Sequence, residues 1–394
     1  MYQLLYYFNL GKNMKIIICI SCILLISLPG HSEKRFNWQD FSNFLAGIPV
    51  SKNSKYTTFI KSRYYKYHTR FINKFWHHLN IYTIKKAIEW NRKYMPDLQQ
   101  DYTVFYPLSG ADAVNMFLIY PSATNYLMIG QENSGIIKNF KLMSHRKARY
   151  GLASLRRIIA SYGYSNYFTS KVLIKETRNY YLNGTLPPIL IFMARLGFAI
   201  KKIQQVEVDR NGTLQIISPT NPMRYYNKTK GVKIFFTKLN SNKICTLTYL
   251  SMTLTNWTVN KRSATGKFLN TYPYFKTMLK SAIYLMHYRG CQGITRFVLR
   301  KSAMIVQDDS GVPYKMLRYG KWKITLFGRY VYIKVEGVRV NKDMTPKLWL
   351  LYNDYKKGSK PLPFKYGYGA TVKGNGSNIQ IAIKNKFLSQ LKNK

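Results

Sequence analysis

From Asp101 onward, short β-rich apolar runs alternate with helical patterns, and this alternation limits the chain to few architectures. Residues 102–108 form an apolar run that stops at Ser109 and Gly110. Residues 111–118 then show a helical pattern, and residues 125–129 form a second apolar run. Strand, turn, helix and strand in this order are typical of the opening of a parallel α/β unit.

The rest of the chain continues the mixture of strands and helices. The turn at residues 209–212 contains Asn211 and Gly212 between two apolar runs, which predicts a hairpin. Further strands are predicted at 199–208, 213–217, 232–236, 245–252, 303–306, 322–327 and 330–335. Further helices are predicted at 146–162, 166–181, 187–196, 274–287, 294–301 and 346–355. We therefore expect an α/β fold built on a single mixed, mostly parallel Rossmann-like sheet, of the methyltransferase-like kind, flanked by helices.

The N-terminal part differs from the α/β part in composition and in the spacing of its apolar residues. Residues 36–95 are aromatic and basic, with apolar residues three and four positions apart, and they predict two or three helices. Adjacent His77 and His78 lack the i, i+4 spacing of a helical metal pair, so we interpret them as surface or packing residues. The predicted organisation is a signal peptide at 1–32, a helical N-terminal region at 33–98, an α/β domain at 99–370 and a basic C-terminal tail at 371–394.

The first residues have the features of an export signal. Met14 and Lys15 precede an apolar run, residues 16–28, which is long enough for a signal-peptide core and shorter than the roughly 20 residues of a membrane span. We expect cleavage near Ser32, translation from Met14, a periplasmic or secreted location, and no transmembrane span in the mature chain. The alternative is an N-terminal anchor that is not cleaved.

The charge of the chain is strongly one-sided. Lys and Arg number 62 against 15 Asp and Glu, which gives a formal net charge of +47. A folded body with this imbalance attracts polyanions, so anionic envelope polymers or a membrane surface are the expected partners. The basic residues are spread along the sequence rather than gathered, so no specific nucleic acid is predicted. The alternative is drift of codon composition. With 46% hydrophobic residues, the chain should fold.

Two cysteines remain after the expected cleavage, Cys245 and Cys291. In an exported protein they could form one disulfide. Two buried free thiols are the alternative, because the spacing does not show that their Cα atoms come close enough.

Acidic residues are rare, and several of them follow strand-like runs. Asp112, Glu132, Asp308 and Asp309 each lie just beyond such a run. Ligands of open α/β sheets bind outside the carboxyl ends of the strands, so these four could share one crevice. The alternatives are helix-dipole stabilisation by Asp112, with Ser109 as an N-cap, and turn formation by the segment 308–311.

Standard catalytic signatures are mostly missing from the sequence. There is no Gly-x-Ser-x-Gly elbow, phosphate-binding loop or His-Glu-x-x-His motif, and no Cys-x-x-Cys follows the signal segment. No metal site is predicted, and the cofactor is unknown. His287, at the end of an apolar run, is either a packed residue or a base.

Five strings of residues carry a family resemblance. They are residues 105–112, 129–132, 282–287, 307–314 and 361–368, with Gln-Asp-Asp-Ser-Gly-x-Pro-Tyr at 307–314 the most specific. Together they resemble a family of bacterial exported proteins of uncharacterised activity. The chain has Ala111, Asn133 and Ile283 where that family usually has Pro, Pro and Ser. The resemblance implies export and does not indicate which reaction, if any, the chain catalyses. The resulting candidate ligand-binding residues are Tyr106, Ser109, Gly110, Asp112, Glu132, His287, Asp308, Asp309, Ser310 and Tyr314.

Three functions compete on this sequence. The first is an envelope-associated protein that binds a ligand in the α/β crevice or a polyanion on its basic surface. The second is an enzyme, or a degenerate enzyme, with a methyltransferase-like Rossmann fold. In such folds an acidic residue after the second strand hydrogen-bonds the ribose hydroxyls of the cofactor, and Glu132 has that position. The third is hydrolysis by Asp308 or Asp309 with His287.

Overall fold

The computed structural model describes residues 36–96, 101–135, 143–165, 182–217, 231–331, 345–367 and 376–388. The chain divides into two units, Met1–Asn37 and Trp38–Lys394. The predicted signal peptide and the start at Met14 lie outside the described residues. The fold below is that of the second unit.

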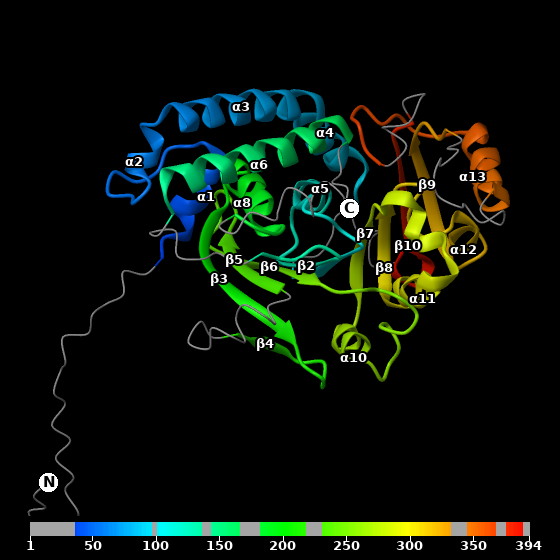
Figure 1. The fold of residues 1–394 in the computed structure, drawn as a ribbon. Coiled ribbons are helices and arrows are strands. Elements are labelled where there is room, and N and C mark those ends of the chain that lie inside the picture. The colour runs from blue at the N-terminus through cyan, green and yellow to red at the C-terminus, as the bar shows by residue number, and fades with distance from the viewer. Residues whose placement is uncertain are drawn as a thin grey trace, which may run out of the picture. The chain divides into compact units, whose positions relative to one another are not determined.

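Ten strands form one mixed sheet in the order β4-β3-β5-β6-β2-β1-β7-β8-β10-β9 (Figure 1). In chain order the strands are β1 (Thr103–Pro107), β2 (Asn125–Gly130), β3 (Ala199–Val208), β4 (Leu214–Ile216), β5 (Gly231–Thr237), β6 (Ile244–Ser251), β7 (Phe275–Leu279), β8 (Ser302–Gln307), β9 (Trp322–Gly328) and β10 (Asn378–Lys384). The expected α/β fold with helices flanking a mixed sheet is confirmed.

Parallel pairing is confined to the centre of the sheet. The strands β6-β2-β1-β7-β8 run parallel to one another. Strands β3, β4 and β5 at one end, and β10 with both of its neighbours at the other, pair antiparallel. Among the described strands, four of the nine neighbouring pairs are parallel, so the expectation of a mostly parallel sheet is not confirmed. The turn after Asp209 joins β3 directly to β4, and a short turn permits only antiparallel pairing.

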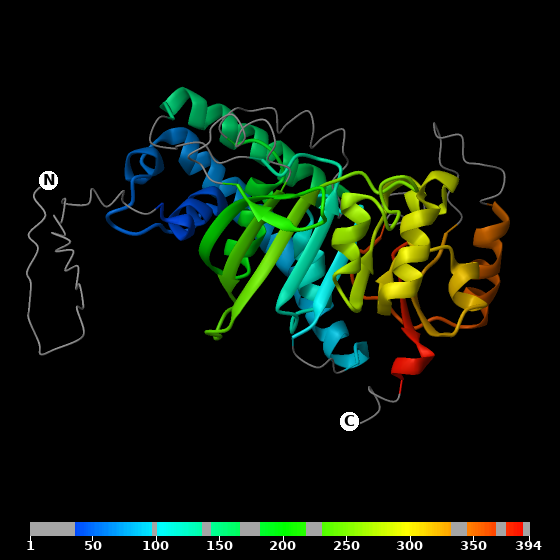
Figure 2. The ribbon, with the colours of Figure 1, turned by 90° about the horizontal axis from the view of Figure 1, so that it is seen from below.

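Helices cover both faces of the sheet. On one face lie α1 (Trp38–Ala46), α3 (Arg63–Leu79), α4 (Lys85–Tyr94), α5 (Ala113–Ile119), α6 (His145–Ser165) and α8 (Leu186–Arg195) (Figure 1). On the other face lie α10 (Ala264–Asn270) and α11 (Gln292–Lys301), which stand in front of the strands when the molecule is seen from below (Figure 2). Helices α12 (Tyr314–Arg318) and α13 (Thr345–Lys357) lie beside β9, while α2 (Thr57–Ile60) precedes α3. No helix within the described residues has the length and apolar character needed to cross a bilayer.

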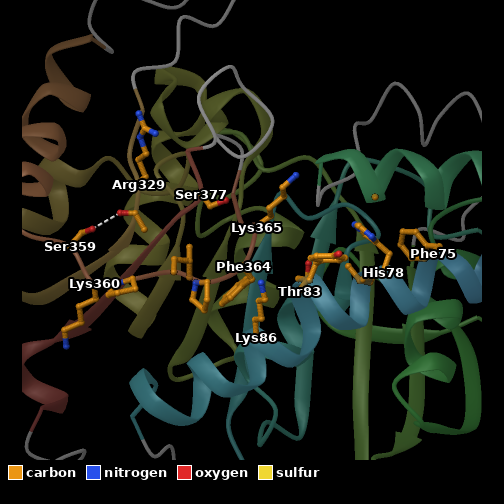
Figure 3. Close-up of a pocket in the computed structure, with 17 residues that line it drawn as sticks. Phe75, His78, Thr83, Lys86, Arg329, Ser359, Lys360, Phe364, Lys365 and Ser377 are labelled. Atoms are coloured by element: carbon orange, nitrogen blue, oxygen red, sulfur yellow. Dashed lines mark hydrogen bonds between the residues drawn. The ribbon is translucent and has the colours of Figure 1, made fainter.

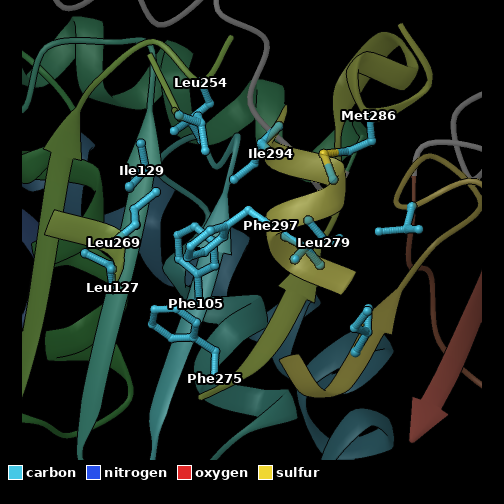
Figure 4. Packing of buried hydrophobic residues seen from close by; sticks show 14 of the residues in the cluster. Phe105, Leu127, Ile129, Leu254, Leu269, Phe275, Leu279, Met286, Ile294 and Phe297 are labelled. Carbon is cyan, nitrogen blue, oxygen red and sulfur yellow. The ribbon is translucent and has the colours of Figure 1, made fainter. Parts of the chain in front are cut away.

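Aromatic packing joins α11 to the central strands. The rings of Phe105 on β1 and Phe275 on β7 are 4.8 Å apart between centroids, and Phe297 of α11 meets Phe105 edge-on at 6.1 Å (Figure 4). All three are buried. Burying an aromatic side chain is among the largest single contributions to a core, so this cluster fixes α11 against β1 and β7.

The predicted helical N-terminal region is confirmed as helical, and it packs on the α/β part. Arg195 of α8 donates a hydrogen bond from Nε to the carbonyl oxygen of Ala46 at 2.7 Å. Phe75 of α3 contacts Tyr162 of α6, and Trp90 of α4 meets Phe327 of β9 edge-on at 5.0 Å. The N-terminal helices are therefore an integral layer of this unit.

Two predictions about the C-terminal half are wrong. Residues 274–287, predicted as a helix, form β7 followed by the 3₁₀ helix η3 (Ala282–His287). Four of the five residues of β7 are buried, and a strand buried on both faces has no polar alternation to distinguish it from a helix. The predicted basic tail contains β10, whose Asn378 and Gln380 are polar yet buried. Predicted elements at 166–181 and most of 330–335 lie outside the described residues.

Cys245 and Cys291 are free thiols, so the disulfide candidate is not formed. Cys245 lies at the amino end of β6, whereas Cys291 ends the short 3₁₀ helix η4 (Arg289–Cys291), beyond the carboxyl end of β7. The two parallel strands therefore place these thiols at opposite edges of the sheet.

His68 is a buried titratable group at the junction of the N-terminal helices. Its Nε2 donates a hydrogen bond to the carbonyl oxygen of Leu45 at 2.8 Å, and the side chain is fully buried. Burial lowers the pKa of His68 from 6.5 to about 4, and the charges of Arg156 and Arg195 act in the same direction. The folded state thus holds a neutral imidazole that the unfolded chain protonates more readily.

The first prediction concerns acid stability. Because the folded pKa is depressed, the contribution of His68 is present above the unfolded pKa and is lost as the pH falls toward the folded pKa. Going from about pH 7 to about pH 5 should remove about 2 kcal/mol of unfolding free energy through this residue. Urea unfolding of His68→Gln at both pH values should show a smaller loss than wild type. His78→Gln, at an exposed position of the same helix, should behave as wild type, and equal pH dependence of all three proteins would contradict the assignment.

Candidate functional site

The order in which the chain adds parallel strands reverses at β1, and the carboxyl ends of these strands lie along one edge of the sheet. The chain goes from β1 through α5 to β2 on one side, while β7 pairs with the other side of β1. Ligand sites of open α/β sheets occur at such a switch point. The segments that leave the strands here are 108–112 after β1, 131–132 after β2, 280–281 after β7 and 308–310 after β8.

Asp112 is the carboxylate nearest the switch point. Its Oδ2 accepts hydrogen bonds from Tyr106 Oη and Asn115 Nδ2, both at 3.0 Å, and lies 3.6 Å from the Nζ of Lys280. Asp112 precedes α5 but makes no side-chain capping bond to that helix. The carboxylate therefore belongs to the polar cluster at the sheet edge. Asp112, and not the predicted Ser109, occupies the N-cap position of α5.

Lys280 places a buried ammonium among acids and aromatic rings. Its side chain is 1% exposed, and Nζ lies over the rings of Tyr162 and Tyr366 at 6.0 and 5.5 Å from their centroids. Burial lowers the pKa of Lys280, while the charges of Asp112 and Asp308 oppose that shift. The ammonium thus interacts with a carboxylate from the β1 loop and with another from the β8 loop.

The segment after β8 folds back on itself and on β7. Ser310 donates from its backbone N to Asp308 Oδ1 at 3.0 Å, and its hydroxyl also donates to that carboxylate. Ser310 Oγ in turn accepts from the backbone N of Ser281 at 2.9 Å. The predicted turn chemistry is therefore present, and it ties the β8 loop to the residues that follow β7.

Asp309 has different hydrogen-bond partners from Asp308. Its Oδ2 accepts from Tyr284 Oη at 3.0 Å, and its backbone N donates to Asn378 Oδ1 at 2.9 Å. Burial raises the pKa of Asp309 well above its ordinary value, and the charge of Asp308 raises it further. Two adjacent buried acids of this kind disfavour simultaneous ionisation.

Glu132 lies beside the same cluster, at the end of β2. Tyr249 of β6 donates a hydrogen bond from Oη to the backbone oxygen of Glu132 at 2.9 Å. Burial raises the pKa of Tyr249, with further contributions from the charges of Glu132 and Asp112, so both carboxylates lie close enough to act on one hydroxyl. A Cβ at Gly130 would come within 2.5 Å of the Ser109 carbonyl oxygen, so only glycine permits this approach of the two loops.

The cluster is buried and contains polar atoms that lack protein partners. Asp112, Glu132 and Asp308 are 2%, 5% and 0% exposed. Within the described residues, no hydrogen-bond partner is found for Ser109 Oγ, Asp112 Oδ1, Glu132 Oε2, Ser281 Oγ, Asp309 Oδ1 and Tyr366 Oη. Buried polar atoms without a partner are rare in proteins, and a group of them at one edge indicates a place that a ligand or ordered water serves.

The structure brings most of the predicted residues to this edge. Tyr106, Asp112, Asp308, Asp309 and Ser310 belong to the hydrogen-bonded cluster, and Ser109, Gly110 and Glu132 are in loops beside it. His287 ends η3, with its ring edge-on to Tyr284 at 5.3 Å.

Tyr314 does not belong to this hydrogen-bonded cluster. It donates from Oη to Asp354 Oδ2 on α13 at 3.0 Å. Sequence reasoning missed Lys280, Tyr284 and Tyr366. For Lys280, the available signal is its place directly after β7, but the pattern of residues 274–287 predicts a helix there.

Within the part of the chain that the structure describes, no three His, Cys, Asp or Glu side chains are placed to hold a metal ion. Comparison of the chain with protein-family models, with curated proteins and with solved structures finds no match in any of the three. The geometry of the site is therefore the basis for a functional proposal.

The second prediction tests the buried ammonium. Lys280→Met preserves most of the side-chain volume but leaves Asp112 and Asp308 without their cation, which should lower the unfolding free energy by about 3 to 5 kcal/mol. Adding Asp112→Asn should recover part of that loss, because one of the two unneutralised carboxylates is removed. Urea unfolding measures both effects.

The matched control is Lys243→Met. Lys243 pairs with Asp101 at 2.6 Å on the surface, where an ion pair contributes little. If the Lys280 and Lys243 variants were equally stable, the ammonium of Lys280 would not be the group that holds the cluster together.

Proposed function

We propose that this protein binds a small, neutral, hydroxyl-rich ligand at the carboxyl edge of β1, β2 and β7. The observation that carries the proposal is the group of buried polar atoms without protein partners at the switch point of the sheet. Asp112 makes no side-chain capping bond to α5, and neither its Oδ1 nor Glu132 Oε2 has a hydrogen-bond partner among the described residues.

The chemistry of these atoms defines the ligand class. Asp112 Oδ1 and Glu132 Oε2 accept hydrogen bonds when ionised, so a matching ligand supplies donors such as hydroxyl groups. The surrounding carboxylates repel an anion, and the ammonium of Lys280 repels a cation. A neutral polyol, such as the ribose of a nucleoside or a sugar, meets both conditions.

The order of the parallel strands favours a nucleoside over other polyols. Counted along the chain, β6-β2-β1-β7-β8 is the order 3-2-1-4-5 of dinucleotide-binding Rossmann sheets. The reversed strand β10 between β8 and β9 resembles the arrangement of methyltransferase-like sheets. Glu132 follows Gly110 by about 20 residues, the spacing of the acid that takes ribose hydroxyls in such folds.

The same geometry disfavours a working methyltransferase. The loop after β1 has one glycine, Gly110, where a phosphate- or cofactor-cradling loop has several. The buried ammonium of Lys280 disfavours a cationic ligand group at the same edge, such as the sulfonium of S-adenosylmethionine. The residues therefore fit the nucleoside part of that cofactor and not its charged part. These residues therefore favour a binding protein, or an enzyme-like fold that has lost its cofactor, over a working methyltransferase.

The third prediction is a binding experiment with adenosine. Titration calorimetry should detect adenosine binding to the wild type, and Glu132→Gln should weaken it about tenfold, because a carboxylate that accepts from hydroxyls is replaced by an amide. Glu89→Gln, at an exposed position on α4, removes the same charge and should bind as wild type.

S-adenosylmethionine and a simple sugar extend the same titration. S-adenosylmethionine should bind more weakly than adenosine because of Lys280. Binding of the sugar alone, with sensitivity to Glu132→Gln, would keep the polyol site and reject the nucleoside. Absence of binding by all three compounds would refute the proposed site.

We also propose that the chain is exported and associates with anionic envelope material. The apolar run 16–28 and the net charge of +47 support this location and these partners.

The fourth prediction tests export. In a bacterial host that expresses residues 1–394, N-terminal sequencing of the periplasmic or secreted fraction should give a chain that begins just after Ser32. Release of that material from envelope fractions should increase with salt, because salt screens the attraction between exposed charges. An intact N-terminus on cytoplasmic protein would contradict export.

A further inference from the structure

Helix α3 has one side that is exposed and entirely basic. Its cations Arg63, Lys66, Arg70 and Lys74, together called the basic face, are all exposed and recur at three or four positions, so they share one side of the helix. The opposite side is formed by the buried residues Tyr65, His68, Ile72 and Leu79. Residues 41–88 contain neither Asp nor Glu. Within the described residues, no carboxylate forms an ion pair with the basic face.

Helix α6 extends this basic surface. It packs beside α3 on the outside of the helical layer (Figure 1, Figure 2). The guanidinium of Arg156 lies over the ring of Tyr67, 4.7 Å from its centroid, and so links the exposed sides of the two helices. Arg146, Arg149 and Arg157 are exposed as well, and α6 has no Asp or Glu in its sequence. The two helices therefore present a joint surface of cations without acids.

This surface ends at a cleft of about 730 Å³ between the helical layer and the segment 359–365 (Figure 3). Phe75 of α3, Gly163 of α6 and Lys86 of α4 line one side of the cleft, and Phe364 lines the other. The described lining of the cleft includes neither Asp nor Glu. An anionic surface that meets α3 and α6 therefore finds no carboxylate along this border.

Large apolar side chains are exposed among these cations. Tyr67 of α3 and Tyr150 of α6 are 55% and 56% exposed. In the π-helical turn η1 (Asn80–Ile84), which joins α3 to α4, Ile81 and Tyr82 are 40% and 54% exposed. Tyrosine rings are favoured at the boundary between lipid headgroups and acyl chains, because one end is apolar and the other polar.

The combination of cations and exposed rings distinguishes a lipid surface from a soluble polyanion. A polymer such as a polyphosphate is attracted by the cations and leaves the apolar side chains in water. An anionic bilayer attracts the same cations and also covers the rings, as happens for basic helices that lie in the membrane interface. The exposed residues of α3, η1 and α6 therefore favour a lipid partner.

We infer that the basic face of α3, together with the exposed cations of α6, docks the protein onto the surface of an anionic lipid bilayer. Helix α3 has 17 residues and is about 25 Å long. When it lies parallel to the membrane, its four cations reach lipid headgroups together, and each one strengthens the attraction. This inference rests on the proposed association with anionic envelope material, which it narrows to a lipid partner and to one face of the protein.

The fifth prediction is measured by sedimentation of the whole chain with lipid vesicles. Vesicles of equal parts phosphatidylglycerol and phosphatidylcholine should bind the wild type at least about tenfold more tightly than phosphatidylcholine alone. The neutral vesicles also measure what the apolar run 16–28 contributes, which is the same in every variant. Substituting the basic face, with Arg63→Gln, Lys66→Gln, Arg70→Gln and Lys74→Gln combined, should weaken binding to the anionic vesicles at least about tenfold. Equal affinity of the wild type for both vesicles would overturn the inference.

The matched control removes two Lys and two Arg charges elsewhere. It combines Lys261→Gln, Arg262→Gln, Lys267→Gln and Arg296→Gln, all at exposed positions on or next to α10 and α11, on the other face of the sheet. This control should bind the anionic vesicles nearly as wild type. Equal weakening of the two quadruple variants would mean attraction by overall charge only, and it would overturn the docking face. Urea unfolding of both variants should match wild type, because the changed side chains are exposed.

An aromatic variant and a soluble polymer separate lipid from other anions. Tyr67→Ser should weaken binding to the anionic vesicles about threefold, whereas Tyr319→Ser, at a position that is 70% exposed after α12, should bind as wild type. Binding to polyglutamate without binding to the vesicles would overturn the lipid partner, while the association with anionic envelope material would stand. Absence of binding to both would refute the inference and that association together.

Discussion

The ion pair of Lys280 with Asp112, supported by the nearby charge of Asp308, is the interaction on which the carboxyl edge of this sheet depends. A carboxylate removed from water is costly unless an opposite charge and hydrogen bonds compensate. One ammonium, 1% exposed, lies between loops that follow β1 and β8, while the serines and tyrosines around it satisfy further oxygens. The loops of β1, β7 and β8 are therefore held together electrostatically in a chain whose remaining charge is overwhelmingly positive.

This arrangement leaves a definite set of polar atoms unused by the protein. A structural network would be expected to satisfy its own members, yet Asp112 Oδ1, Glu132 Oε2 and Ser281 Oγ have no partner among the described residues. They come from the ends of β1, β2 and β7. In open α/β sheets, ligands bind at such an edge, where the strand order changes direction.

Much of the fold could be predicted from local pattern, and the failures have a common cause. Strands β1, β2, β3, β6 and β8 and helices α6, α8 and α11 lie close to their predicted positions, because their periodicity and turn residues are local signals. Strand β7 was interpreted as a helix because burial on both faces removes alternation. Strand β10 lies within the predicted basic tail, and its polar Gln380 is buried and accepts a hydrogen bond from Gln307 Nε2 at 3.0 Å. In both cases the neighbours, not the segment itself, determine the structure.

The sequence by itself determined the α/β class, the excess of positive charge, and the placement of scarce acids after strand-like runs. These follow from composition and short-range periodicity. Only the tertiary structure decided that Lys280 reaches Asp112 and that Tyr314 turns instead to Asp354. It alone joined Phe75 and Lys86 to Phe364 in one cleft. The physical reason is that such contacts depend on which strands become neighbours, and strand pairing between segments far apart in the chain is set by burial and hydrogen bonding across the whole sheet.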